Sequence, residues 1–378
     1  MGTYSRKRAA ERIAELARRG DDLVTFWRGS TELLAETVPH YWSPCWFTLD
    51  PASLLVTSHF QDGLPEIPAE WLAREYYDEH DVHKLADVAR CAPGISTLHE
   101  ATGGDPASST RWHLNMTLGG DQEMIAALRT PTGEVWGALG LYREPRQPMF
   151  DRDDVEFVRS IAPVLAEGAR RALLIGEASD PEGPQAPGLV VLREDWEVES
   201  LTPGVERLLG ELPDGDWDAG RLPSSVLAVA GRALRSGEHP AHPGQVAVSR
   251  VLSRAGTWVV LHGASLVSDG SRRVAVIVEP AHPARIAPLL MSAYGLTERE
   301  QDVTRLVLQG ESTSAIAQRL VVSPHTVQQH LKSIFEKTGV RSRRDLVGKV
   351  FFAHYEPRLR DNEQRALDER PLRGGPVG

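Results

Sequence analysis

A polar helix face near the end of the chain carries side chains that can read the edges of DNA bases. An α-helical period over residues 324–337 places the polar side chains on one side: His325, Gln329, Lys332 and Glu336, with Gln328 on the flank. The opposite side is apolar: Val327, Leu331, Ile334 and Phe335. An amide can bind adenine bidentately, and an ammonium can donate to guanine acceptors. This pattern indicates a helix suited to the major groove of double-stranded DNA.

A shorter helix and a tight turn must hold this face in place. Ser312 or Thr313 can cap the shorter helix, which ends before the break at residues 321–323. Ser323 then supplies an N-cap, and Pro324 takes the first helical position, where the missing N–H costs nothing. The sequence therefore predicts a helix, a tight turn and a second helix.

Flanking helices complete a predicted four-helix module from Leu296 to Phe352. Upstream, Thr297 and Glu300 have the spacing of a capping box. Downstream, residues 342–345 form a similar cap for a last helix. An ordinary helical domain with a solvated polar face would give the same pattern, since helix-turn-helix geometry also occurs outside DNA binding.

The run LTEREQDVTRLVLQGESTSAIAQRLVVSPHTVQQHLKSIFEKTGVRSRRDLV resembles the LuxR-type (NarL/FixJ) DNA-binding domain. The L-T-x-R-E opening, the I-A-x-x-L of the second helix, S-x-x-T-V-x-x-H and K-x-G-V-x-x-R all have the family's spacing. The resemblance implies that the third helix enters the major groove and that the fourth helix often dimerises the domain. It says nothing direct about the rest of the chain.

The resemblance also implies roles for individual residues. Gln328, Gln329 and Lys332 correspond to groove-facing positions, whereas Thr326, Lys337 and Arg343 correspond to backbone-contact or scaffold positions. The predicted DNA-binding set is Thr313, Ser314, Ser323, His325, Thr326, Gln328, Gln329, Lys332 and Lys337. The family's packing further predicts a partly buried ion pair between Glu300 and Arg343.

Two positions depart from the family pattern. Thr313-Ser314 stands where many members have Asn-Lys, and Gln328 stands where many have Lys. Both departures reduce the positive charge that would anchor the domain on phosphates.

The charge distribution fits a DNA-binding end on an acidic body. The chain of 378 residues is 41% hydrophobic, enough for two or three cores, and carries a net charge of −10. Residues 296–352 hold nine Arg and Lys against six Asp and Glu, a balance of +3 that leaves −13 on the rest. Such a body would not bind DNA through its bulk surface.

The cysteine count and the hydropathy indicate the cellular compartment of the protein. Cys45 and Cys91 offer no disulfide framework and no metal quartet, so a reducing cytoplasm is expected. The N-terminal residues 4–8 lack the apolar core of a signal peptide, and no apolar run approaches a membrane span. We expect a cytoplasmic protein without a membrane partner.

Residues 1–176 resemble a GAF domain in the order of their predicted elements. Two helices come first, over residues 6–20 and 23–37, followed by an aromatic cluster and a strand at 54–58. The later elements are helices near 68–78 and 80–90, a loop at 102–110, strands at 122–129 and 134–142 around a turn, and a helix at 151–175. We expect this region to be a sensor domain.

Residues 189–282 resemble a PAS-like domain, again by element order. Strands at 189–192 and 196–200 precede helices near 203–209 and 224–234, and three strands follow at 245–253, 257–265 and 273–279. The proline-rich residues 177–188 read as a linker. The helix-turn-helix domain is expected at 290–354, after a connecting helix at 283–294, with a disordered tail at 355–378. The predicted class is an α+β multidomain protein.

Aromatic residues of the first region are candidates for a ligand pocket, although core packing explains any single one of them better. The predicted ligand-binding set is Tyr41, Trp42, Trp46, Trp112 and Trp136. His80, His83, Cys91 and His99 could ligate a metal, but their spacing matches no metal site, and scattered histidines explain them better. The sequence identifies no cofactor.

These patterns favour a DNA-binding transcriptional regulator, acting as a homodimer and controlled by a small ligand. An enzyme would need a nucleophile or metal constellation that the sequence lacks. A phosphorylation-gated response regulator would begin with a strand ending in paired carboxylates, whereas this chain begins with two helices. A sensor or adaptor acting through protein contacts remains an alternative, because the basic contacts are reduced.

Overall fold

The computed structural model describes residues 3–63, 67–78, 80–174, 187–238, 247–268, 271–281 and 283–347. The chain forms two compact units, which we call the N-terminal unit (Met1–Gly176 with Ala186–Pro280) and the C-terminal unit (Ala281–Gly378 with Glu177–Gln185). The fold is mixed α and β, with two antiparallel sheets in the first unit and helices in the second. Most of the predicted linker and all of the predicted tail lie outside the described residues.

The first sheet has the strand order β2-β1-β5-β4-β3, and every pairing is antiparallel. Its strands are β1 (Cys45–Leu49), β2 (Val56–Phe60), β3 (Ile95–Thr97), β4 (Gln122–Arg129) and β5 (Val135–Arg143). The central pair β4–β5 is the predicted hairpin, and Gly133 in its turn has φ +104°. That positive φ is why the turn favours glycine.

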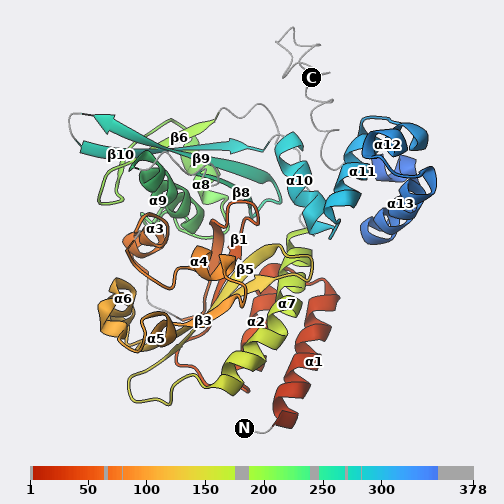
Figure 1. Ribbon diagram of the computed structural model, residues 1–378. Helices are drawn as coiled ribbons and strands as arrows, with labels where there is room; N and C mark the ends of the chain where they lie inside the picture. Colours follow the sequence, from red (N-terminus) through yellow and green to blue (C-terminus); the bar gives the residue numbers. More distant parts are fainter. Residues whose placement is uncertain are drawn as a thin grey trace. The chain divides into compact units, whose positions relative to one another are not determined.

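Helices cover both faces of this sheet (Figure 1). One face carries α1 (Thr3–Arg19), α2 (Leu23–Ala35) and α7 (Arg152–Leu174). The other side of the sheet holds the shorter elements α3 (Ala69–Tyr77), α4 (Leu85–Arg90), α5 (Leu98–Ala101), η1 (Pro106–Ser108) and α6 (Thr110–Thr117). The predicted helix at 80–90 begins only at Leu85, because His83 takes a left-handed φ of +64° that a helix cannot accommodate.

The second sheet has the order β7-β6-β10-β9-β8 and is also antiparallel. Its strands are β6 (Gly188–Leu192), β7 (Val198–Leu201), β8 (Val248–Leu252), β9 (Trp258–Ser268) and β10 (Ser271–Pro280). The helices of this region are α8 (Val205–Gly210) and α9 (Ser224–Glu238). Helix α9 packs on β9 and β10 and also against α3 and β2 of the first sheet region.

The two sheet regions share one hydrophobic core, although the sequence predicts two separate domains. One buried cluster includes Phe47 and Ala138 of the first sheet together with Val229 and Val276 of the second region. The α3–α9 contact is so close that a Cβ on Gly231 would lie 2.3 Å from the carbonyl oxygen of Ala73.

Polar contacts also connect the two sheet regions. The buried carboxylate of Asp50, at the end of β1, accepts from the backbone N–H of Arg250 at 2.9 Å and from its Nη2 at 2.7 Å. The Asp214 carboxylate accepts from the backbone N–H groups of His59 at 2.7 Å and Ser224 at 2.9 Å. Because each charge has several donors, the two sheet regions meet through satisfied polar groups as well as apolar packing.

The C-terminal unit is built from α10 (Pro283–Ala293), α11 (Glu298–Leu308), α12 (Thr313–Leu320) and α13 (Pro324–Thr338). Residues 343–347 are helical, and Ser342 Oγ accepts from the backbone N–H of Asp345 at 3.1 Å. The rest of the predicted last helix lies outside the described residues. Within the described ranges, none of the helices combines the length and apolarity that a bilayer span requires.

Candidate nucleic-acid interface and pocket

Helices α12 and α13 join through a sharp turn at Val321. This residue adopts φ +54° and ψ +49° as the C-cap of α12, and 89% of its surface is exposed. A β-branched residue rarely adopts the left-handed region, so this turn is a strained point that the surrounding packing must hold. It redirects the chain within the predicted break at 321–323.

Side-chain caps fix where each helix of the module begins. Thr297 and Glu300 form the predicted capping box on α11, in which Glu300 Oε2 accepts from the backbone N–H of Thr297 at 2.8 Å. Ser312 caps α12, and Ser323 caps α13 through the backbone N–H of Thr326 at 3.0 Å. These capping predictions are confirmed, because they depend only on local spacing.

The two faces of α13 separate as the periodicity predicts. Val327, Leu331 and Ile334 are buried in one cluster with residues of α11 and α12. The exposed side chains of α13 include His325, Gln328, Gln329, Lys332, Glu336 and Lys337. Gln329 Nε2 lies 3.2 Å from His325 Nε2, so these two side chains interact one turn apart on the exposed face.

The hydroxyls in the predicted DNA-binding set have local partners. Ser323 Oγ and Thr326 Oγ1 lie 2.8 Å apart at the start of α13. Thr313 is half-buried, Ser314 is exposed, and Thr313 Oγ1 accepts from Arg343 at 3.4 Å. Ser323 and Thr326 are therefore engaged at the start of α13, and Thr313 is engaged by Arg343.

The predicted ion pair between Glu300 and Arg343 is wrong. Glu300 pairs instead with Lys337, whose Nζ lies 2.7 Å from Oε2, and Ser333 donates to Oε1 at 2.6 Å. Arg343 donates to the backbone carbonyl of Glu311 and to Thr313. Burial acts to raise the pKa of Glu300, but the hydrogen bonds from Lys337, Ser333 and the Thr297 N–H hold it below its usual value.

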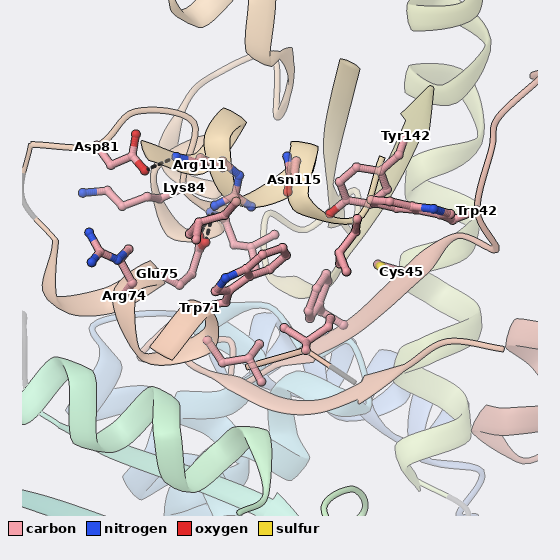
Figure 2. A pocket seen from close by; sticks show the side chains of 16 residues that line it. Trp42, Cys45, Trp71, Arg74, Glu75, Asp81, Lys84, Arg111, Asn115 and Tyr142 are labelled. Carbon is pink, nitrogen blue, oxygen red and sulfur yellow. Dashed lines mark hydrogen bonds and ion pairs between the residues drawn. The ribbon is translucent and has the colours of Figure 1, made fainter. Parts of the chain in front are cut away.

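The N-terminal unit contains a pocket between the first sheet and the helices α3 and α6 (Figure 2). Its empty volume is about 740 Å³, including the part open to solvent. Its apolar lining side chains are Trp42, Phe47, Ile67, Trp71, Leu72, Leu85, Leu114, Leu118 and Tyr142, with Cys45 beside them. Its polar lining side chains are Arg74, Glu75, Asp81, Lys84, Arg111 and Asn115.

The two ends of the pocket differ in character. Figure 2 shows Trp42 and Tyr142 at one end, and Arg74, Asp81 and Lys84 at the other. The rings of Trp42 and Tyr142 lie 4.8 Å apart. Burial raises the pKa of Tyr142 well above its ordinary value and that of Cys45 to about 12, so both groups are neutral near pH 7.

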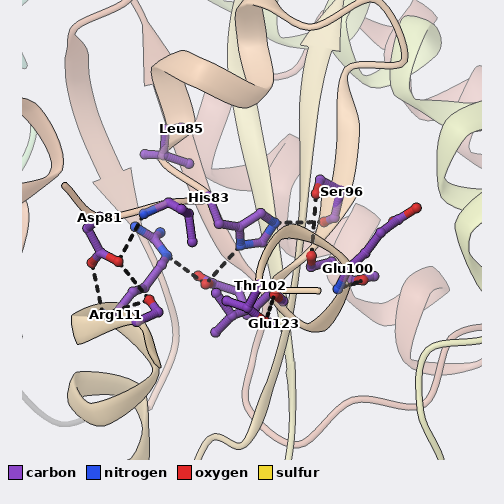
Figure 3. A network of polar contacts seen from close by, with 12 residues as sticks. Asp81, His83, Leu85, Ser96, Glu100, Thr102, Arg111 and Glu123 are labelled. Carbon is purple, nitrogen blue, oxygen red and sulfur yellow. Dashed lines mark hydrogen bonds and ion pairs between the residues drawn. The ribbon is translucent and has the colours of Figure 1, made fainter. Parts of the chain in front are cut away.

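A buried polar network centred on Arg111 backs the pocket (Figure 3). Arg111 Nε donates to Glu123 Oε2 at 2.6 Å, and Nη1 donates to Glu75 Oε2 at 2.5 Å. His83 Nδ1 lies 3.3 Å from the same Glu123 oxygen, and its Nε2 lies 2.9 Å from the carbonyl oxygen of Ser96. The network ties α3, β4, α6 and the chain before α4 together.

The charges of this network stabilise one another. Burial acts to raise the pKa of Glu123, but the Arg111 charge and the hydrogen bond from His83 outweigh it and lower the pKa to about 2. Burial likewise acts to lower the pKa of Arg111, and the carboxylates of Glu123 and Glu75 hold it well above its usual value. Both groups therefore stay charged at neutral pH.

Of the predicted ligand-binding set, only Trp42 lines this pocket. Trp46 lies on the opposite face of β1, where it stacks on Trp27 with ring centroids 4.4 Å apart. The exposed Tyr41 packs on Trp42, and Trp112 Nε1 donates to Asp121 at 3.0 Å. Trp136 is only 1% exposed and does not line the pocket.

Sequence reasoning missed most of the lining residues. Glu75, Arg111 and Asn115 come from helices of ordinary amphipathic composition, and no motif distinguishes them. Of the metal candidates, His83 is engaged with Glu123 and Ser96. Across the described ranges, no three His, Cys, Asp or Glu side chains gather as a metal-binding group.

The caps, the buried seam and the exposed polar face together form a helix-turn-helix domain. A family profile described as "Bacterial regulatory proteins, luxR family" matches residues 295–350. The spore germination protein GerE of Bacillus subtilis is 38% identical over 52 residues, which are 14% of this chain and 70% of that protein. The chain thus belongs to the luxR family through its C-terminal domain.

Other relatives match over segments of similar length. An HTH-type transcriptional regulator of Mycobacterium bovis is 54% identical over 55 residues, 15% of this chain. The matched segment spans only 6% of that protein's length. The monoamine regulon transcriptional regulator of Klebsiella aerogenes is 39% identical over 56 residues, 15% of this chain and 25% of that protein.

Two solved structures are similar at lower levels. The VqsR LBD domain of Pseudomonas aeruginosa has a TM-score of 0.31 and 16% identity, over 46% of this chain and 98% of that one. SdiA in complex with octanoyl-rac-glycerol has a TM-score of 0.33 and 12% identity, over 94% of this chain and 99% of that one.

Proposed function

We propose that this protein is a DNA-binding transcriptional regulator that reads a major-groove site with α13 and is controlled by a small ligand. The observation that carries the proposal is the α12–α13 geometry: a buried seam fixes the helix pair and leaves Gln328, Gln329 and Lys332 exposed on one side. Such a face can present amides and an ammonium to base edges.

The pocket of the N-terminal unit supports the regulatory half of the proposal. Its lining combines aromatic surface with a few polar side chains, as small-molecule sites usually do. We assign it the sensor role that the GAF-like and PAS-like element orders suggest. We infer a non-enzymatic protein that acts on DNA, and the two free cysteines, Cys45 and Cys91, fit a reducing cytoplasm.

We further propose a homodimer, since paired domains read two half-sites. Helix α7, predicted over residues 151–175, is a poor candidate for the dimer contact. Its apolar residues Val158, Ile161 and Leu165 are buried in the same cluster as residues of α1, α2 and the first sheet. The helix that begins at residue 343 is the better candidate.

A salt titration of DNA binding tests this function. The full chain is titrated with a DNA site enriched from a random pool, at several salt concentrations. We expect the logarithm of the association constant to fall linearly with the logarithm of the salt concentration. The double variant Gln329→Ala/Lys332→Ala should lose preference for the enriched site, whereas Lys7→Ala, which removes an exposed lysine of the N-terminal unit, should not.

The same titration decides the alternative of an adaptor that acts through protein contacts. That alternative is favoured by one observation: Lys337, a predicted backbone-contact position, is paired with Glu300 and so offers less charge to a phosphate. A chain with no measurable DNA affinity and no salt slope would contradict the regulator and support the adaptor.

A further inference from the structure

We propose that His325 positions the side-chain amide of Gln329, and that the amide held in this way favours adenine at the operator position it reads. The inference deepens the proposed function and rests on it, because it assigns a base to one side chain of α13. It starts from a contact between two exposed side chains of that helix, in which Gln329 Nε2 lies 3.2 Å from His325 Nε2.

The helix itself fixes the spacing of these two side chains. Residues four apart on an α-helix lie one above the other on the same face. Ser323 caps the first turn of α13 through the backbone N–H of Thr326, and Val327 is fully buried on the opposite face. The backbone that carries His325 and Gln329 is therefore held by a cap and by core packing, so the contact is present before DNA binds.

The two atoms in contact determine which one donates. An amide nitrogen can only donate a hydrogen bond, so the Nε2 of His325 must accept it. An imidazole nitrogen accepts only when it carries no hydrogen. In this contact His325 is therefore neutral, with its ring hydrogen on Nδ1.

The charged groups of the helix-turn-helix domain have other partners. Those of α11, α12 and the turn between them are Glu298, Arg299, Glu300, Asp302, Arg305, Glu311 and Arg319. All of these except Glu298 form ion pairs, either with one another or with Lys337. The other charged or titratable side chains of α13 are His330, Lys332, Glu336 and Lys337. Within the described ranges, none of these groups forms an ion pair or a hydrogen bond with His325, whose one side-chain contact of this kind is with Gln329.

The contact leaves Gln329 the groups that adenine requires. The amide nitrogen carries two hydrogens, and His325 takes one of them. The second hydrogen and the Oε1 acceptor remain, and a bidentate contact to adenine N7 and N6 uses one donor and one acceptor of this kind. An amide that is already held also loses less rotational freedom when DNA binds. His325 should therefore raise the preference for adenine over the other bases.

Protonation of His325 would reverse this arrangement. A charged imidazole has two N–H donors and no acceptor, so it repels the amide nitrogen and attracts Oε1 instead. The acceptor that adenine needs is then turned toward the ring. The added positive charge would also strengthen the attraction to phosphate, but for all sequences alike. Only the change at the amide alters the ratio of affinities between two operators.

Competition binding with the full chain tests this role. The competing operators differ only at the position whose preference Gln329→Ala relaxes, and they are compared at pH 8 and pH 5.5, across which histidine side chains change charge. We expect the wild-type preference for adenine to be at least threefold weaker at pH 5.5 than at pH 8. His325→Ala should show a preference at least threefold below the wild-type value at pH 8, and this preference should not change with pH.

A conservative variant supplies the rescue. The side-chain oxygen of His325→Gln can accept from Gln329 but does not titrate, so adenine preference at pH 8 should be kept and should persist at pH 5.5. His80→Gln makes the same substitution at an exposed position of the N-terminal unit and should keep the wild-type pH dependence. Circular dichroism shows that each variant is folded. A pH dependence that persists in His325→Gln, or a preference for another base, would overturn the inference.

The position of the ring hydrogen is measured without DNA. Two-bond ¹H–¹⁵N spectra of the full chain with ¹⁵N-labelled histidine report which ring nitrogen carries the hydrogen. The signal that is lost in His325→Gln identifies His325. We expect the hydrogen on Nδ1 at pH 8, and a hydrogen on Nε2 would contradict the contact that carries the inference.

The positioning role and the regulator fail separately. Absence of any sequence preference at either pH would refute the regulator, and the reading role with it, even if His325 carries its hydrogen on Nδ1. A clear sequence preference that His325→Ala leaves unchanged would refute the positioning role alone.

Discussion

Lys337 Nζ lies 2.7 Å from Glu300 Oε2, so an ion pair joins the first turn of α11 to the last turn of α13. The carboxylate is almost fully buried, whereas a third of the lysine side chain is exposed. This contact fixes the first turn of α11 relative to the last turn of α13.

Removal of Lys337 should loosen the C-terminal unit. Lys337→Ala leaves the Glu300 carboxylate buried without its cation, which should cost about 1–2 kcal/mol of unfolding free energy, allowing for the partial exposure of the lysine. Hydrogen-exchange mass spectrometry on peptides from residues 298–338 would show the loss of protection. Lys332→Ala, an exposed lysine on the same helix, is the matched control and should change stability by less than about 0.5 kcal/mol. Equal effects of the two changes would reject this role.

Lys332 should contribute to base discrimination. It is exposed on the polar face, and no ion pair engages it in the described part of the chain. Lys332→Ala should relax preference at one operator position by about 1–3 kcal/mol while nonspecific binding changes little. If the change instead weakens all sequences alike and flattens the salt slope by about one unit, Lys332 contacts phosphate rather than a base.

Gln329 should affect preference without affecting the salt dependence. Gln329→Ala removes an amide and no charge, so discrimination at an adjacent operator position should fall while the salt slope stays the same. Competition binding with single-base operator variants measures both quantities. Unaltered preferences in both the Gln329 and Lys332 variants would show that another element reads the DNA.

The close contact between α3 and α9 should tolerate no side chain at residue 231. Alanine normally stabilises a helix interior relative to glycine, by about 1 kcal/mol. In Gly231→Ala, however, the new Cβ would lie 2.3 Å from the Ala73 carbonyl oxygen, so we expect a net loss of roughly 1–3 kcal/mol. Gly210→Ala, whose Cβ would meet no atom within 4 Å, is the control. Thermal unfolding followed by tryptophan fluorescence would distinguish them, and a stabilised Gly231→Ala would contradict the close packing.

The Glu123 network should make part of the stability of the N-terminal unit pH-dependent. The folded-state pKa of Glu123, about 2, lies below its ordinary value of 4.5, so its contribution is present above about pH 4.5 and is lost as the pH falls toward 2. The stability advantage of the wild-type protein over Glu123→Gln, measured by urea unfolding, should therefore shrink across this range. Glu100→Gln, at an exposed position, should show no such trend. A constant advantage would mean that Arg111 and His83 do not favour the ionised form.

Local signals predicted much of the secondary structure, because they depend on neighbours in the sequence, but β1, β3 and α6 were not predicted. The strand at 122–129 is β4 as expected, and the Pro131–Gly133 turn leads into β5. Ser323 and Pro324 start α13 as their residue types require. The predicted ion pair between Glu300 and Arg343 was wrong, because a cap fixes where a helix starts but does not determine which cation from another helix reaches the capping carboxylate.

The pocket was harder to predict, because it depends on strand alternation and on contacts between distant residues. Adjacent residues of a strand point to opposite faces, so Trp46 packs beneath α2 and α7 while Phe47 lines the pocket. Composition treats the two aromatics alike. The two sheet regions share one core, in which Gly231 packs against Ala73. This shared core cannot be predicted from the sequence of either region alone.

The core that the two sheet regions share has a consequence for how the N-terminal unit unfolds. Because α9 packs against α3 and both regions contribute to one buried cluster, opening either region alone would expose apolar surface of the other. The two regions should therefore lose their structure in one cooperative transition rather than one after the other.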